Sequence, residues 1–343
     1  MSKKPLILGI ESSCDETAAS LITENEEGFP VVLSNIVSSQ VEVHREFGGV
    51  VPELAARSHI EKIDWIVKKA IDESGRKIEE IDAVASTAGP GLIVCLSVGL
   101  SFGKAFATAM NKPFIAVNHL EGHALSPKLN TNLNYPYLLL LISGGHSQYL
   151  SVQNLGKYKR LGTTIDDALG EAFDKTAKLL GIEFPGGPQI EILAKKGDPE
   201  KYDLPKPIFS KGGCNLSFAG LKTAVLKISK TIKSEQDKYD LAASFQKTIE
   251  EILYKKTKIA FTEFEKINEL NEKIFVVAGG VAANKKIRSM LINLCEENNY
   301  KSIFPPIEFC GDNAAMIAMV GLEKFKINQF DDLDYPAKPR WPL

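Results

Sequence analysis

Short apolar runs alternate along the chain with longer stretches in which apolar residues recur at helical spacing. Such runs predict buried strands at residues 6–10, 83–87, 114–117, 137–142 and 274–278. Each run ends in glycine, serine or asparagine, which is typical of a strand that enters a tight turn. The alternation of strands and helices along the chain predicts an α/β fold.

The helical stretches differ in polarity. Residues 92–110 are long, apolar and rich in small side chains, so we expect a buried helix. Residues 164–181 predict an amphipathic helix, which Asp166 or Thr164 could cap. Asn118 is placed to cap a further helix directly after the third predicted strand.

Two halves of the chain follow a similar scheme. PLILGIESSCDETAASLI and PYLLLLISGGHSQYLSV each predict a strand, a turn of small residues and a second strand. STAGPGL and VVAGGVAAN each predict a strand, a glycine turn and a helix. A duplication would give two lobes with four such turns around one cleft. Coincidence is an equal alternative, because α/β chains reuse the strand–glycine–helix unit widely.

Composition narrows the class of protein. A chain of 343 residues, 44% hydrophobic and 24% charged, can form about two domains and is not intrinsically disordered. Its net charge of −2 excludes a globally basic nucleic-acid binder, though not a local basic patch, and lysine clusters such as 255–258 are expected to be solvated. No apolar run approaches the roughly 20 residues of a membrane span. Five scattered cysteines predict no disulfide framework, so we expect a cytoplasmic protein without a membrane segment.

A histidine pair is the first candidate for chemistry. His119 and His123 in NHLEGHALSP are four residues apart, a spacing that places both imidazoles on one helix face and suits a transition metal. Asp312, next to the flexible Gly311, is a candidate third ligand. Glu121 is not where a zinc protease of the HExxH type has its base. On spacing alone, two surface histidines are the better-supported alternative.

Glycine turns are the second candidate. Backbone N–H groups at Ser143-Gly144-Gly145 and at Gly279-Gly280 could bind a phosphate at the start of a helix, although most such turns are only turns. Neither GxxxxGK[ST] nor GxGxxG follows the first strand, which argues against P-loop and Rossmann nucleotide binding. The acidic face of the helix at 164–181 is either solvated or available to ribose hydroxyls.

Ten motifs in order, from residue 9 to the C-terminal residues, give the chain a family resemblance. It resembles the TsaD family, the bacterial tRNA N6-adenosine threonylcarbamoyltransferases related to the catalytic subunit of the archaeal and eukaryotic KEOPS complex. The motifs are GIESSCDETAAS, STAGPGL, NHLEGHALSP, LLISGGHSQ, IDDALGEAFDKTAKLLG, PGGP, LSFAGLKTAV, AGGVAAN, CGDNAAMIA and PRWPL.

The resemblance implies the actin-like ASKHA fold. Its N-terminal lobe would comprise residues 1–130 with about 305–343, and its C-terminal lobe residues 131–304. His119, His123 and Asp312 would hold one divalent metal, iron or zinc. Asp15 in ESSCDET is a candidate catalytic base.

The resemblance also implies an adenylate site, with Asp174 at the ribose and Asn284 on the opposite lobe. Glu191 stands where a gram-positive-like form of the family has an aspartate, so it is a secondary candidate. The residues implied to bind the adenylate are Leu141, Ile142, Ser143, Gly144, Gly145, Asp174, Gly187 and Asn284.

The implied reaction transfers the threonylcarbamoyl group from threonylcarbamoyl-AMP to N6 of the adenosine 3′ of the anticodon (position 37) in tRNAs that read ANN codons. Its implied partners are TsaB and TsaE, with TsaC supplying the adenylate. An ATP phosphotransferase of the same fold is an alternative, although Glu11-Ser12-Ser13 replaces its DxGT pattern. A metalloprotease is suggested by the histidine pair alone, and a non-catalytic scaffold would be favoured only without that pair.

Overall fold

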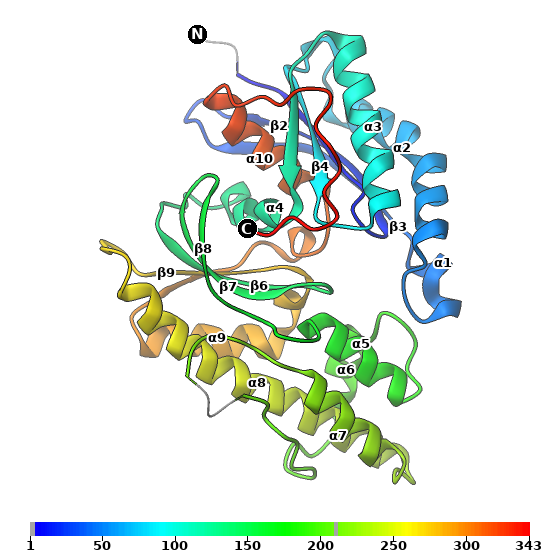
Figure 1. The fold of residues 1–343 in the computed structure, drawn as a ribbon, viewed down its shortest axis with the longest axis vertical. Coiled ribbons are helices and arrows are strands. Elements are labelled where there is room, and N and C mark those ends of the chain that lie inside the picture. The colour runs from blue at the N-terminus through cyan, green and yellow to red at the C-terminus, as the bar shows by residue number, and fades with distance from the viewer. Residues whose placement is uncertain (1–3, 209–211) are drawn as a thin grey trace. The chain divides into compact units, whose positions relative to one another are not determined.

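The computed structural model describes residues 4–208 and 212–343 (Figure 1). Contacts between residues divide it into two compact units. The first unit runs to Leu133 and resumes at Pro305–Leu343, and the second comprises Asn134–Phe304. Each unit contains one five-stranded mixed sheet with helices packed against it, so the α/β prediction is confirmed.

The first sheet has the strand order β3-β2-β1-β4-β5. Strands β1, β2 and β3 form an antiparallel meander, whereas β4 pairs parallel with β1 and β5 parallel with β4. The three strands predicted in this part of the chain are confirmed to within two residues at either end. The bounds are β1 (Ile7–Glu11), β2 (Glu16–Glu24), β3 (Pro30–Ser39), β4 (Ala83–Gly89) and β5 (Phe114–Asn118).

The second sheet repeats this topology, with the order β10-β9-β6-β7-β8. Its first strand, β6, again lies between an antiparallel meander on one side and parallel strands on the other. The duplication inferred from the sequence is therefore present in the strand topology. The bounds are β6 (Tyr137–Ile142), β7 (Ser147–Asn154), β8 (Lys157–Thr163), β9 (Ile274–Ala278) and β10 (Lys301–Ile303).

Helices cover both faces of the first sheet. Alternate residues of β1 point to opposite faces, so Leu8 and Ile10 pack in the core beneath α2 and α3, whereas Gly9 packs against α10. A Cβ at Gly9 would lie 2.5 Å from Ala314 O, so glycine lets α10 approach the sheet closely. The helices are α1 (Val41–His44), η1 (Arg45–Phe47), α2 (Pro52–Ser74), η2 (Ile78–Glu80), α3 (Ile93–Met110), α4 (His119–Leu125), η3 (Ser126–Leu129), η5 (Ile307–Phe309) and α10 (Ala314–Lys326).

In the second unit, helices pack around the sheet and against one another. The long helix α8 packs against β6, β8 and the neighbouring helices α6, α7 and α9. Lys256 on α8 is fully buried and donates a hydrogen bond to Gly213 O at 3.1 Å, so the expectation that the cluster 255–258 is solvated is wrong at this residue. The helices are α5 (Leu169–Leu179), α6 (Gly186–Ala194), α7 (Ala219–Ser229), α8 (Glu235–Glu265), η4 (Gly280–Ala283) and α9 (Lys285–Glu297).

Helix α3 forms as predicted but is not buried. Only 33% of its residues are buried, because Gly99 and Gly103 face the sheet while Ile93 and Val94 are exposed on the other side. Its mean hydropathy of 1.6 over 18 residues also meets the length and composition of a membrane span. The prediction that no run approaches that length is therefore wrong, although the same test is passed by core helices of folded proteins.

Helix α5 begins later than predicted. Asp166 does not cap it, because its carboxylate accepts hydrogen bonds from Ser217 Oγ at 2.5 Å and Phe218 N at 2.8 Å and so caps α7. Helix α5 therefore starts at Leu169 without a side-chain cap. The two glycines of PGGP, Gly186 and Gly187, form the first turn of α6.

Candidate functional sites

Two helix caps place the predicted metal ligands in the first unit. Asn118 Oδ1 accepts hydrogen bonds from Leu120 N and Glu121 N, so α4 starts at His119 as soon as β5 ends. Asn313 caps α10 in the same way, by accepting from Met316 N at 3.0 Å. Asp312 therefore lies directly before α10, which packs against α4.

The three predicted ligands converge. Asp312 Oδ1 lies 3.1 Å from His123 Nε2 and 3.5 Å from His119 Nε2, and one ligand atom from each residue lies within 4.8 Å of the others. The imidazole rings are 4.8 Å apart and nearly perpendicular. His119 is 7% exposed and His123 is fully buried, so the alternative of two surface histidines is wrong.

A carboxylate that the sequence analysis did not assign to the site supports this cluster. Glu11, the last residue of β1, is fully buried, and its Oε2 lies 3.1 Å from His119 Nδ1. Thr87 Oγ1 and Ser13 N donate to the same carboxylate at 2.6 and 2.5 Å. Its only sequence signal is a charged residue at the end of an otherwise apolar strand.

Burial and neighbouring charges shift the titration of this cluster. Burial alone would lower the pKa of His119, but the carboxylates of Asp312 and Glu11 raise that pKa well above its ordinary value. Burial alone would raise the pKa of Asp312, but His119 and His123 hold it well below its usual range. The pKa of Glu16 is raised well above its ordinary value by burial, Asp312 and Asp15. Two imidazoles and several carboxylates gathered in a buried site fit a divalent transition metal.

Asp15 lies at the edge of the same cluster. It is 9% exposed, in the turn between β1 and β2, and its carboxyl group hydrogen-bonds that of Glu16. Burial and the nearby Asp15 and Asp312 raise the pKa of the Cys14 thiol, so this cysteine is not an activated nucleophile. The structure therefore places Asp15 near the predicted metal ligands, with no hydrogen bond to them among those assigned in the described residues.

The predicted glycine turns lie together in the second unit. Strands β6 and β9 are parallel neighbours, with Leu141 opposite Ala278, so the turns that follow them are adjacent. A Cβ added at Gly144, Gly145 or Gly280 would meet no atom of the described chain within 4 Å. Packing does not require glycine at these three positions, and the open space beside their backbone can admit a ligand.

The other implied adenylate residues hold the starts of helices near these turns. Asp174 Oδ1 accepts from Gly186 N at 2.8 Å, which fixes the first turn of α6 against α5. Asn284 caps α9 by accepting from Lys286 N and Ile287 N at 3.1 and 3.0 Å.

A further set of polar contacts surrounds the start of α9. Asn284 Nδ2 donates to Gln246 Oε1 at 3.1 Å, and Glu191 Oε1 accepts from Lys285 N at 3.1 Å. Asp174 and Asn284 both belong to the second unit, so the expectation of Asn284 on the opposite lobe is wrong. Gln246 was not predicted from the sequence, because a glutamine inside a long polar helix carries no distinguishing signal.

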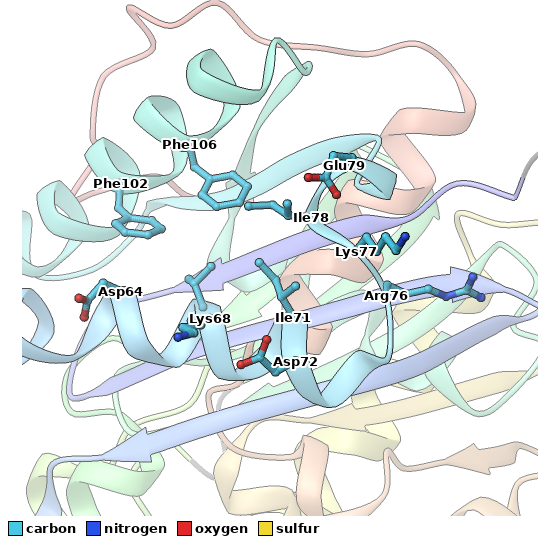
Figure 2. A pocket seen from close by; sticks show the side chains of 11 residues that line it. Asp64, Lys68, Ile71, Asp72, Arg76, Lys77, Ile78, Glu79, Phe102 and Phe106 are labelled. Atoms are coloured by element: carbon cyan, nitrogen blue, oxygen red, sulfur yellow. The ribbon is translucent and has the colours of Figure 1, made fainter.

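A groove elsewhere in the first unit contains none of the predicted site residues. It has a volume of about 450 Å³ and lies between the C-terminal half of α2, η2 and α3. Figure 2 shows Phe102 and Phe106 of α3 on one side and Ile71 of α2 on the other, with Lys68 and Arg76 among the charged residues around them.

Known proteins that are similar to this chain in sequence belong to one family. Residues 31–319 match the family model of TsaD, described as tRNA N6-adenosine threonylcarbamoyltransferase. A protein of that name from Pelagibacter ubique is 80% identical over 100% of this chain and 96% of its own length. Another from Rickettsia conorii is 54% identical over 98% of both chains.

Solved structures add the fold. HypF from T. kodakarensis superposes with a TM-score of 0.64 at 13% identity, covering 98% of this chain and 50% of its own. A ROK hexokinase from Thermus thermophilus superposes with a TM-score of 0.50 at 13% identity, covering 94% and 99%. These neighbours share the actin-like ASKHA fold. With this fold and with a family match over most of its length, the chain belongs to the TsaD family of tRNA N6-adenosine threonylcarbamoyltransferases.

Proposed function

We propose that this chain transfers the threonylcarbamoyl group from threonylcarbamoyl-AMP to N6 of the adenosine at position 37 in tRNAs that read ANN codons, in the cytoplasm. The amine nitrogen attacks the carbamoyl carbonyl, the bond from that carbon to the phosphate oxygen breaks, and AMP leaves. The family match over residues 31–319 is the observation that carries this proposal. The two units described above would serve as the two lobes of the fold.

We infer that His119 Nε2, His123 Nε2 and Asp312 Oδ1 hold one divalent metal, iron or zinc. Their convergence within 4.8 Å and the mixture of nitrogen and oxygen donors support this assignment. When bound there, such a metal supplies a Lewis acid that can polarise the carbamoyl carbonyl.

The adenylate is proposed to bind the second unit. Open backbone at Gly144, Gly145 and Gly280 supports a phosphate contact, because nothing in the described chain fills that space. Asp174 would accept a hydrogen bond from the ribose. Gly187 and Asn284 lie at the starts of α6 and α9, where the helix dipole favours an anion, and Glu191 is a secondary contact.

The acceptor adenosine lies in the anticodon loop, where a base is easier to turn into a pocket than in a duplex. N6 must lose a proton as the new bond forms. Asp15 is the proposed base, since it is a nearly buried carboxylate beside the cluster that contains Asp312.

A partner surface is proposed on α2 and α3. The exposed apolar side chains Ile93 and Val94, and the groove in Figure 2, support this location, because large apolar patches on a single chain usually mark interfaces. TsaB is the proposed occupant, with TsaE joining the complex and TsaC supplying the adenylate.

Nucleoside analysis tests the proposed reaction. The purified chain would be incubated with threonylcarbamoyl-AMP and an unmodified ANN-reading tRNA, with and without TsaB and TsaE, and the digested nucleosides analysed by mass spectrometry. We expect threonylcarbamoyladenosine, formed over many turnovers only with the partners, and none on a tRNA with guanosine at position 37. Absence of the product under all conditions, together with ATP phosphotransfer or metal-dependent peptide cleavage, would favour one of the alternative activities.

A further inference from the structure

Glu11 is a buried charge in the first unit that packing does not explain. It is fully buried at the end of β1, where the preceding residues of the strand are apolar or glycine. A carboxylate in such a place is unfavourable unless it is paired and hydrogen-bonded. An apolar residue would fill the same volume without that cost.

Fixed elements hold this carboxylate in place. Oε1 accepts from the backbone N–H of Ser13 at 2.5 Å, and Oε2 accepts from Thr87 Oγ1 on the neighbouring strand β4 at 2.6 Å. The remaining contact of Oε2 is with His119 Nδ1, at 3.1 Å. Because an ionised carboxylate only accepts hydrogen bonds, His119 Nδ1 is the donor in this contact, and Ser13 Oγ, 3.2 Å from the same nitrogen, can accept from it as well.

The two histidines differ in how many of their ring nitrogens contact other side chains. The Nε2 of His119 faces Asp312 Oδ1 at 3.5 Å, on the opposite side of the ring from Glu11. His123 Nδ1 is buried without a hydrogen-bond partner among the described residues, and only its Nε2 is held, 3.1 Å from Asp312 Oδ1. The described chain therefore orients His119 from both nitrogens and His123 from one.

We infer that Glu11 is a positioning residue that keeps the proton of His119 on Nδ1 and leaves Nε2 free to bind the metal. This inference rests on the proposed metal site, and Glu11 itself contacts neither metal nor substrate. Carboxylates that accept the second N–H of a metal-bound histidine fix the ring and strengthen its binding. Glu11 is built to do so, because Ser13 and Thr87 leave its carboxylate no freedom to turn away.

Zinc affinity of the full chain tests the inference. Glu11→Gln preserves the size of the side chain but leaves one accepting oxygen for three donors. We expect zinc binding, measured by competition with a chromophoric chelator, to weaken about 10–100-fold. Glu121→Gln is the matched control, since Glu121 is a buried carboxylate on α4 whose Oε2 lies 3.4 Å from Lys324 Nζ. Its zinc affinity should equal that of the wild type, and thermal melts would compare the folding of both variants.

A second measurement needs no variant. In the zinc-loaded wild type, long-range nitrogen–proton spectra of labelled histidines should show His119 with a proton on Nδ1 and zinc on Nε2. Zinc on Nδ1, or equal affinity in Glu11→Gln and wild type, would overturn the inference while leaving the metal site in place. A wild-type chain that takes up no divalent metal would overturn the metal site and, with it, this inference.

Discussion

The two units share one strand topology but place different residues where the first strand of each sheet ends. In the first unit, β1 ends in the buried carboxylate of Glu11, which supports His119. In the second, β6 is followed by Ser143-Gly144-Gly145, and a Cβ at either glycine would meet no atom of the described chain. A site made of side chains can hold a cation, and a site made of backbone N–H groups can hold an anion. The comparison teaches that one duplicated strand topology can carry a proposed cation site in one unit and a proposed anion site in the other.

Removing one of the proposed metal ligands should have the largest effect on metal affinity and on activity. We expect His119→Ala or His123→Ala to lose more than about 100-fold in metal affinity, beyond the cost of a supporting residue, and to lose threonylcarbamoyl transfer. Metal analysis by plasma emission and the tRNA assay would be run on each variant. His44→Ala removes another buried histidine outside the cluster and should keep its metal. Transfer by a variant shown to be metal-free would contradict a catalytic metal.

Two glycines should separate binding from stability in the second unit. Gly144→Val places its side chain in open space, so we expect unfolding free energy within about 0.5 kcal/mol of wild type but at least roughly tenfold weaker adenylate binding. In Gly170→Ala the new Cβ would lie 2.7 Å from Ser143 O, and we expect a stability loss of about 1–3 kcal/mol. Calorimetry with AMP and urea unfolding check both. Unchanged AMP binding in Gly144→Val would remove this turn from the site.

Asp174 should contribute less than the backbone turn. We expect Asp174→Ala to weaken adenylate binding by about 1–3 kcal/mol, the scale of a lost hydrogen bond to a charged group. Because Asp174 also accepts from Gly186 N, Asp174→Asn is the control that retains an acceptor for α6. Calorimetry that shows wild-type affinity in Asp174→Ala would place the ribose elsewhere.

The smallest expected effect is on acid stability, where the first unit relies on charge. Burial alone would raise the pKa of Glu323, but Lys128, 2.6 Å away, and Lys326 hold that pKa below its ordinary value. The ion pair of Glu323 with Lys128 therefore stabilises the fold at pH values above the pKa that Glu323 has in the unfolded chain. This stability is lost as the pH falls through the lower pKa that Glu323 has in the folded protein. We expect Glu323→Gln to remove about 1 kcal/mol of the stability that wild type loses between about pH 5 and pH 3.

Urea unfolding across this range checks the effect of Glu323. The exposed Glu27→Gln serves as the control and should leave the pH profile unchanged. Identical profiles for Glu323→Gln and wild type would show that the Lys128 pair contributes nothing.

Strands were predictable from the sequence because their signal is local. Six consecutive apolar residues at Tyr137–Ile142, bounded by Pro136 and the turn Ser143-Gly144-Gly145, favour a short buried strand, and the strand forms with those bounds. The start of α5 was not predictable, because the Asp166 carboxylate accepts a hydrogen bond from Phe218 N, which lies far along the chain. The exposure of Ile93 and Val94 was missed for a similar reason, since composition does not say which side of a helix faces the sheet.

The residues of the candidate sites also divide into those with a local sequence signal and those whose role depends on contacts formed only in the folded chain. His119, His123 and Asp312 were predicted from spacing and motifs, and their convergence required the packing of α4 on α10. Glu11 was not assigned, because its partners Ser13, Thr87 and His119 come together only in the folded sheet.

The first unit is built from two separate segments of the chain, so its parts are synthesised at different times. The second unit is one continuous segment, Asn134–Phe304, so all of its strands are synthesised before Asp312 is added. The first unit, by contrast, lacks α10 and the third metal ligand until translation has passed them. A nascent or truncated chain that ends before Pro305 contains both glycine turns but cannot assemble the histidine–aspartate cluster. Binding of the proposed metal would therefore require translation to pass Asp312.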